Sequence, residues 1–230
     1  MSGLVLECFS AASLLPPPHP GAPTRYQGAC VSGASPEVLA DILRPECNLA
    51  IWHRTLPRRL RTGLRPLLAA APFSVSAEGE LEAALTVLTE ALPAPPGFEL
   101  LQDIAQLALF FAALAETGEA VRLRLEGITG PACHRWHADA VGLRLLCTYC
   151  GPGTEFLPLA GGAEAARALD PAALPCPAGR VATGAAALLK GEAYPGNAGF
   201  GCLHRSPPAG AGPRARLLLC LDEPGRIPPE

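Results

Sequence analysis

The chain has 230 residues, of which 49% are hydrophobic and 17% are charged, and its formal net charge is −3. This length and apolar content are enough for one sizeable core and exclude disorder over most of the chain, but they do not suffice for several independent domains. The basic residues are scattered rather than clustered, which argues against nucleic acid or an anionic membrane as a partner. We therefore expect a small or neutral partner, either a small molecule or a peptide.

The chain carries no sequence mark of export. No basic segment precedes an apolar stretch at the amino terminus, and nine cysteines without a regular framework fit a reducing compartment. The longest apolar run, from Leu107 to Ala115, is far shorter than the roughly 20 residues that a membrane span needs. We expect a soluble, cytoplasmic protein that does not enter the membrane.

The first half of the chain is predicted to be mostly helical. Residues 1–30 form an irregular lead-in that contains a run of prolines. Ser35 is typical of a helix N-cap, Pro36 suits the first helical turn, and Pro45 ends the apolar face between them. After a short strand-like piece at 48–52, the periodicity predicts three further helices, at about 57–70, 80–92 and 99–116. Residues 31–118 are therefore expected to form a helical buttress.

The pattern changes at Glu119 to short strands and turns. Apolar and charged residues alternate from Val121 to Glu126, which predicts a half-buried strand. Further strands are predicted at 141–149, 154–157, 185–189, 201–204 and 216–221, with a helix near 163–169. Strands after a helical block indicate an α+β fold, in which the helices pack on a small barrel or sandwich formed by residues 119–230 within one integrated domain.

The segment from Cys133 to Asp139 is the strongest candidate for a metal site. In an extended backbone His137 and Asp139 point to the same side, about 7 Å apart along the strand, so that one ion can bind both. A third ligand is available in His204, which closes a predicted strand just before two prolines. Two histidines and one carboxylate on one face of a metal form the facial triad of non-haem Fe(II) oxygenases.

This pattern resembles the cupin-type Fe(II)/2-oxoglutarate-dependent dioxygenases, whose motif is His-x-Asp, a distant His, and an Arg about ten residues later. Arg214 and Arg216 follow His204 by ten and twelve residues. In that superfamily the arginine opens the last core strand and binds the far carboxylate of 2-oxoglutarate, so Arg216, which heads a predicted strand, is preferred. The resemblance implies a double-stranded β-helix (jelly-roll or cupin-like) barrel over 119–230, Fe(II) and 2-oxoglutarate as cofactors, and hydroxylation of an unknown substrate.

A second resemblance covers the C-terminal half and, more weakly, the helical half. The strings at 134–139, 146–155, 188–197 and 204–208 resemble the bacterial family called domain of unknown function 1826. Members of that family are often encoded beside GTPase metallochaperones in zinc-responsive gene neighbourhoods, and the family has no established reaction. The resemblance implies metal biology and a functional link to such a metallochaperone, without specifying the metal.

Three alternatives remain open on the sequence. Neutral imidazole suits Zn(II) as well as Fe(II), so the protein can also be a zinc-binding protein of metal homeostasis without oxygenase activity. Such a zinc site can draw on the same histidines or on a second set of residues: Cys133, His134, Cys147, Cys150 and Cys202. In the second alternative, His137 and His204 are interior residues satisfied by hydrogen bonds, and Asp139 caps a turn. The third is a degenerate barrel kept for interaction only, which predicts no stoichiometric metal.

Three further side chains are candidates for holding a carboxylate-bearing co-substrate. Tyr149, Lys190 and Asn197 lie in or next to the turn-rich segments that a barrel places at its open end. They offer a hydroxyl, an ammonium and an amide, which are groups that can position a carboxylate. Residues of these types in such segments also commonly cap turns or face solvent, so these three rank below the arginines.

Overall fold

The computed structural model describes residues 29–130, 132–160, 162–169, 178–207 and 215–225. The strands are β1 (Ala29–Gly33), β2 (Cys47–Trp52), β3 (Phe73–Glu80), β4 (Ala120–Ile128), β5 (Leu143–Cys150), β6 (Glu155–Ala160), β7 (Gly179–Arg180), β8 (Ala186–Lys190), β9 (Cys202–Arg205) and β10 (Arg216–Asp222). The helices are the 3-10 helix η2 (Pro36–Leu43) and the α-helices α1 (Arg58–Gly63), α2 (Arg65–Ala69), α3 (Leu81–Ala91), α4 (Phe98–Ala115) and α5 (Gly162–Ala168). This content confirms the α+β class.

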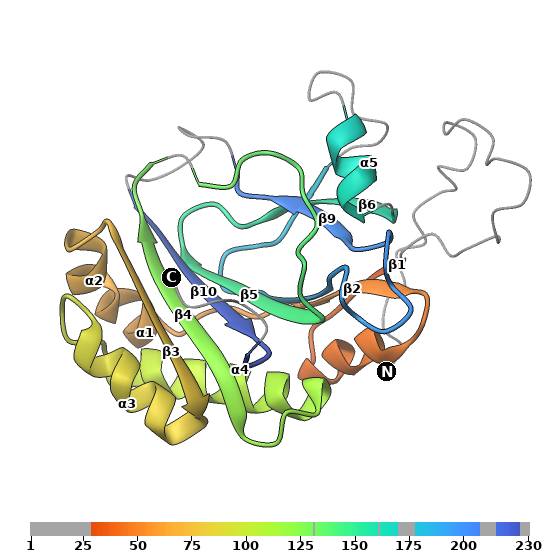
Figure 1. Cartoon of the computed structure of the whole chain (residues 1–230). Coiled ribbons are helices and arrows are strands. Elements are labelled where there is room, and N and C mark those ends of the chain that lie inside the picture. The colour runs from red at the N-terminus through yellow and green to blue at the C-terminus, as the bar shows by residue number, and fades with distance from the viewer. Residues whose placement is uncertain (1–28, 131, 161, 170–177, 208–214, 226–230) are drawn as a thin grey trace, which may run out of the picture.

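The described strands form two sheets. The larger has seven strands in the order β1-β2-β8-β5-β10-β4-β3, and the smaller has three in the order β7-β6-β9. All neighbours are antiparallel except β1 and β2, which are parallel. Figure 1 shows α1–α4 along one side of the large sheet, while β6, β9 and α5 lie on its other side. The large sheet is thus the middle layer of the molecule.

Strand β10 shows how the sequence builds these layers. Its residues Leu217, Leu219 and Leu221 belong to the main core, together with the buried stripe of α4. Leu218 and Cys220 point to the opposite side and belong to a second core, between the two sheets. Because successive side chains of a strand alternate between the faces, a strand buried on both faces requires an uninterrupted apolar run, which is the sequence from Leu217 to Leu221.

The N-terminal half contributes strands as well as helices. β1, β2 and β3 all join the large sheet, although only the strand at 48–52 was expected from the sequence. In β3, Val75 and Ala77 face the main core, whereas Ser74 and Ser76 alternate with them. The predicted helix at 57–70 is divided into α1 and α2 at Leu64, and the helix after Ser35 is a 3-10 helix, so both predictions were wrong in detail. All of the strands predicted beyond Glu119 are present, and the helix near 163–169 is α5.

Helix α4 is long and apolar enough to cross a membrane by length and composition alone. Core helices of soluble proteins pass the same test, so this is weak evidence for a membrane segment. Four of its apolar side chains are completely or almost completely buried against the sheet and the neighbouring helices: Leu100, Ile104, Leu107 and Phe111. The apolar character of α4 is therefore accounted for, on this face, by the core of the protein.

Candidate metal centre

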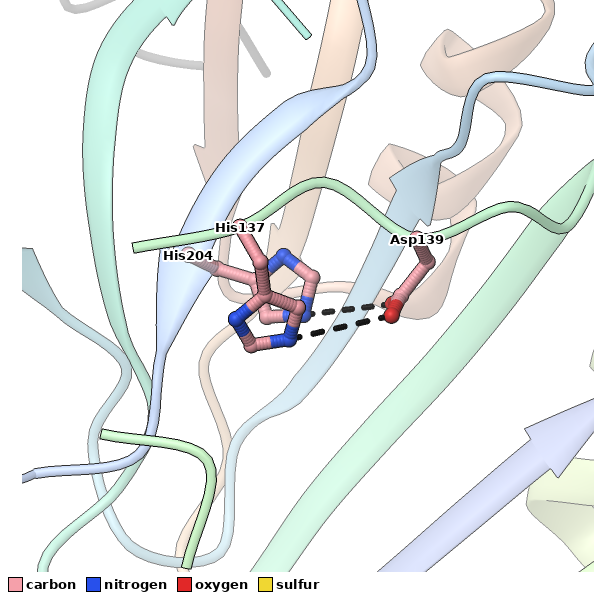
Figure 2. A group of neighbouring side chains, drawn as sticks. All are labelled: His137, Asp139 and His204. Carbon is pink, nitrogen blue, oxygen red and sulfur yellow. Dashed lines mark ion pairs between the residues drawn. The ribbon is translucent and has the colours of Figure 1, made fainter. Parts of the chain in front are cut away.

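Three of the predicted side chains meet at one point on the side of the large sheet that faces away from α1–α4. His137 and Asp139 lie on the loop between β4 and β5, and His204 comes from β9 (Figure 2). One ligand atom from each of the three lies within 4.8 Å of the other two. The backbones of the two histidines also form an isolated antiparallel bridge, with N···O distances of 3.0 and 2.9 Å. The loop is therefore fixed to β9 by the backbones of the two residues that carry the imidazoles.

The hydrogen bonds of the two rings determine which nitrogen faces the carboxylate. Nδ1 of His137 lies 2.9 Å from the carbonyl oxygen of Arg135, and Nδ1 of His204 lies 3.0 Å from that of Cys202. A carbonyl oxygen can only accept, so each Nδ1 is the protonated nitrogen. In the neutral rings Nε2 then carries a lone pair, and both Nε2 atoms face Asp139. Metal-binding histidines commonly have this arrangement.

The charges at the site favour the protonation states that bind metals. Burial alone would raise the pKa of Asp139, but His204, Arg144 and His137 outweigh it and hold that pKa far below its usual range. The pKa of His137 is lowered, mainly by burial and then by His204. At neutral pH the site therefore presents an ionised carboxylate and a neutral His137 imidazole, which are the forms that ligate metals.

The distances suit one small divalent cation. Nε2 of His204 is 3.2 Å from Oδ2 of Asp139, and Nε2 of His137 is 3.8 Å from Oδ1. Ligand atoms about 2.1 Å from a metal are about 3.0 Å apart at right angles and about 3.4 Å apart in a tetrahedron. Oδ2 of Asp139 is buried and has no hydrogen-bond partner. A divalent cation between these three atoms would accept a lone pair from each of them.

Arg144 of β5 fixes the carboxylate from the other side, and the sequence did not indicate it. Its Nη1 lies 2.8 Å from Oδ1 of Asp139, while Nε and Nη2 donate to the two carboxylate oxygens of Asp222 at 2.7 and 2.9 Å. Because Arg144 and Asp222 are direct partners in the pairing of β5 with β10, this contact joins residues 78 positions apart. Arg144 occupies one oxygen of Asp139 and leaves the other for a ligand.

The site opens into a cavity of about 660 Å³. His137 and His204 line it together with Arg144, Thr154 and Ser206. The wall continues across Leu218 of β10 to residues of β4 and β3. A cavity of this size is typical of small-molecule sites, and both histidines lie on its wall.

Arg216, predicted to bind a co-substrate carboxylate, lies behind the wall of this cavity. It is only 6% exposed, and it donates to the hydroxyls of Ser206 (3.0 Å), Thr148 (3.2 Å) and Thr154 (3.0 Å). Among the described residues it forms no ion pair, and its buried Nε has no hydrogen-bond partner. Burial lowers the pKa of Arg216 to about 10, against a smaller opposing effect of Glu126. A buried guanidinium held only by neutral hydroxyls next to a cavity suits an anionic ligand.

The three lower-ranked candidates lie elsewhere. The hydroxyl of Tyr149 donates to Oδ2 of Asp103 on α4 (2.7 Å), on the helix side of the sheet. Nζ of Lys190 donates to the carbonyl of Arg44 (2.6 Å), and Asn197 donates to the carbonyl of Gly191 (3.0 Å) within a turn. None of the three lines the cavity at the metal centre, because each is occupied with its own local contact. Arg214 lies outside the described residues.

The cysteines do not assemble a second site in the part of the chain that the structure describes. The only group there with three or more possible metal ligands is the triad of His137, Asp139 and His204. Cys147 is buried in the main core, where burial raises the pKa of its thiol to about 11, and Cys202 belongs to the core between the sheets. Cys133 is exposed. These cysteines are therefore distributed over different environments.

A family model described as "Protein of unknown function (DUF1826)" matches residues 33–222. A comparison with curated proteins gives no match. The matched range includes all three residues of the metal centre as well as Arg144 and Arg216.

Several solved structures are distantly similar to this chain. The dioxygenase for auxin oxidation 1 from Arabidopsis thaliana, in a complex with 2-oxoglutarate, is 11% identical over 76% of this chain and 74% of that chain, with a TM-score of 0.43. A prolyl-4-hydroxylase from Pseudomonas putida is 15% identical over 81% of this chain and 96% of that chain, with a TM-score of 0.44. A full-length Neurospora crassa protein, in a complex with alpha-KG and 5-formyluracil, is 12% identical over 73% of this chain and 65% of that chain, with a TM-score of 0.38.

Proposed function

This chain belongs to the DUF1826 family of proteins of unknown function, and we propose that it is an Fe(II)- and 2-oxoglutarate-dependent oxygenase that hydroxylates a substrate not yet identified. One observation carries the proposal. His137, Asp139 and His204 offer three ligand atoms to one point, at the wall of a cavity that also has a buried arginine behind it. Two imidazoles and one carboxylate with open positions opposite are the ligand set of non-haem Fe(II) oxygenases.

The residues divide the work between the metal and the co-substrate. His137, His204 and Oδ2 of Asp139 would hold Fe(II), and the cavity leaves room for further ligands on the open side. When bound there, Fe(II) and 2-oxoglutarate supply the chemistry in which O2 oxidises the 2-oxo acid to succinate and CO2 and hydroxylates a substrate C–H bond. Arg144 keeps Asp139 ionised and confined to one free oxygen.

Arg216 would bind the far carboxylate of 2-oxoglutarate. A guanidinium can bind a carboxylate through two parallel hydrogen bonds, and burial strengthens such a pair. The hydroxyls of Thr148, Thr154 and Ser206 hold the guanidinium in place, and two of them line the cavity. The anion would supply a direct ion-pair partner, which Arg216 lacks among the described residues because its hydrogen bonds go to hydroxyls. A site that only stores or senses zinc has no use for this arginine.

We also propose that the two facing sheets are the double-stranded β-helix of such oxygenases, with α1–α4 as its buttress. The large sheet buries its apolar face on these helices, and its opposite face carries Arg144, Thr148 and Arg216. The smaller sheet supplies His204. This division explains why the polar residues of the site lie between the sheets rather than under the helices.

The test is the anaerobic addition of Fe(II) and 2-oxoglutarate to the purified protein. We expect a weak visible charge-transfer band that His137→Ala abolishes and that the matched variant His134→Ala retains, because His134 is exposed and outside the triad. Arg216→Met should weaken the binding of 2-oxoglutarate but not the binding of Fe(II). Arg180→Met, which replaces an exposed arginine, should change neither affinity. If the protein does not bind 2-oxoglutarate or does not form succinate, the proposal is wrong. If the protein instead binds zinc stoichiometrically, and Arg216→Met does not change the amount bound, the zinc alternative is favoured.

A further inference from the structure

The cavity at the metal centre continues well beyond the ligands of the metal. From His137 and His204 its wall crosses β10 at Leu218, reaches Arg124 and Glu126 of β4, and ends on Phe73 and Ser74 of β3. At about 660 Å³ it has room for a small substrate in addition to a co-substrate of the size of 2-oxoglutarate. The far end, on β4 and β3, is therefore the part of the cavity that a substrate would occupy.

Two opposite charges stand side by side at that end. Arg124 and Glu126 are two residues apart on β4, so both point to the cavity side, while Leu123 and Leu125 are completely buried on the helix side. Their side chains are 21% and 23% exposed, and Nε of Arg124 lies 3.6 Å from Oε2 of Glu126, which is beyond hydrogen-bond distance.

The direct partners of this pair on the adjoining strands are uncharged, although Arg144 and Asp222 also act on Arg124, and Arg216 acts on Glu126. On β10 the partner of Arg124 is Cys220 and that of Glu126 is Leu218. On β3 the corresponding partners are Ser76 and Ser74. A half-buried ion pair of this kind adds little to stability, because desolvation of the charges offsets their attraction. Its position on the cavity wall instead suits a ligand that has both a cation and an anion.

We propose that Arg124 and Glu126 recognise the ammonium and carboxylate groups of an α-amino acid, which would be the substrate class of this site. In an α-amino acid the ammonium and carboxylate groups are attached to the same carbon atom, so the two charges lie next to each other, as the charges of the two side chains do. Arg124 would bind the carboxylate through its guanidinium fork, and Glu126 would accept hydrogen bonds from the ammonium. The rest of the amino acid would extend along the cavity towards His137 and His204.

The pair also explains which ligands would be rejected. A purely anionic ligand at this end would meet the carboxylate of Glu126, and a purely cationic one would meet the guanidinium of Arg124. Only a zwitterion satisfies both. The inference rests on the proposed function for the position of the reacting atom, but the recognition of a zwitterion depends on β4 alone.

The experiment is a binding screen of the standard free L-amino acids by saturation-transfer NMR, on metal-free protein and on protein loaded anaerobically with Fe(II) and 2-oxoglutarate. The amino acid that binds best is then compared with its N-acetyl and its amide derivatives by titration calorimetry. We expect each derivative to bind about 10- to 100-fold more weakly, since each removes one charge-assisted contact. These comparisons use the unaltered protein, so they do not depend on whether a variant folds.

Variants then assign each charge to its residue. In Arg124→Gln the amino acid and its amide derivative should bind with equal affinity. In Glu126→Gln the amino acid and its N-acetyl derivative should bind with equal affinity. The matched control is Glu78→Gln, which alters an acid that lies 3.9 Å from Arg122 on the neighbouring strand and does not line the cavity. In this control the amino acid should still bind more tightly than its amide and than its N-acetyl derivative.

The outcomes separate this inference from the proposed function. If Fe(II) and 2-oxoglutarate bind but no amino acid does, or if the derivatives bind as well as the parent, zwitterion recognition is wrong and the oxygenase proposal stands. If an amino acid binds with the expected discrimination but 2-oxoglutarate does not bind, zwitterion recognition is supported and the oxygenase proposal is wrong.

Discussion

Replacement of Arg144 by methionine should strongly destabilise the metal-free protein. The guanidinium lies within 2.9 Å of both oxygens of Asp222 and within 2.8 Å of Oδ1 of Asp139. The exposed fractions of these three side chains are 12%, 2% and 11%. Loss of one partner from a buried ion pair typically costs about 3–5 kcal/mol, because the remaining charge stays buried without a counter-ion. For a chain of this size that corresponds to a melting temperature lower by about 6–20 °C.

The assay is urea unfolding at pH 7 in the presence of a chelator, followed by circular dichroism. The matched variant is the double replacement Arg144→Met with Asp222→Leu, which should recover part of the loss because an apolar pair can replace a buried ion pair at little cost. The difference between Arg144→Met and the unaltered protein should shrink towards pH 3, because protonated carboxyls need no counter-ion. A loss below about 1 kcal/mol, the range of exposed pairs, would refute the argument.

Two further predictions concern the polar residues on either side of the sheet. Tyr149→Phe should lower the free energy of unfolding by about 1–3 kcal/mol, because Asp103 loses the hydroxyl that donates to it, but it should leave 2-oxoglutarate affinity in calorimetric titration unchanged. An affinity loss of about tenfold or more would place Tyr149 in the co-substrate site. The depressed pKa values of His137 and Asp139 contribute stability that is present above the unfolded-state values and is lost as the pH falls through the folded-state values. The metal-free protein should therefore lose stability below about pH 6.5 and again below about pH 4, and His137→Gln should remove the first step from its pH-stability curve.

The positions of the triad could be predicted because they depend on local backbone rules. Alternation along an extended chain placed His137 and Asp139 on one side, and the prolines after His204 marked the end of a strand. The period of two from Val121 likewise fixed β4 as a strand. These signals lie within a few neighbouring residues, so they can be read without knowledge of which strands are paired.

What the sequence did not reveal depends on pairing between distant strands. Arg144 meets Asp222 only because β5 lies beside β10 in one register. Tyr149 was expected near the pocket, yet the same alternation places it with Cys147 on the helix side, whereas Thr148 faces Arg216. Alternation alone would have placed Tyr149 and Thr148 on opposite faces of the sheet, but the sequence does not show which face of β5 is turned towards the helices. Strand β3 was missed because its short polar run lies between predicted helices.

The backbone bridge between His137 and His204 affects the order in which the protein folds and binds a metal. Two main-chain hydrogen bonds hold the loop to β9, and each imidazole is aimed by a further bond to a carbonyl. The entropy of arranging these two ligands is therefore lost when the chain folds, not when an ion arrives. Folding and metal loading are then separate steps, unlike those of a zinc finger, which is unfolded without its metal. The ion that the protein carries would accordingly be decided by what is delivered to the folded site, which makes metal supply a point at which the cell can control this protein.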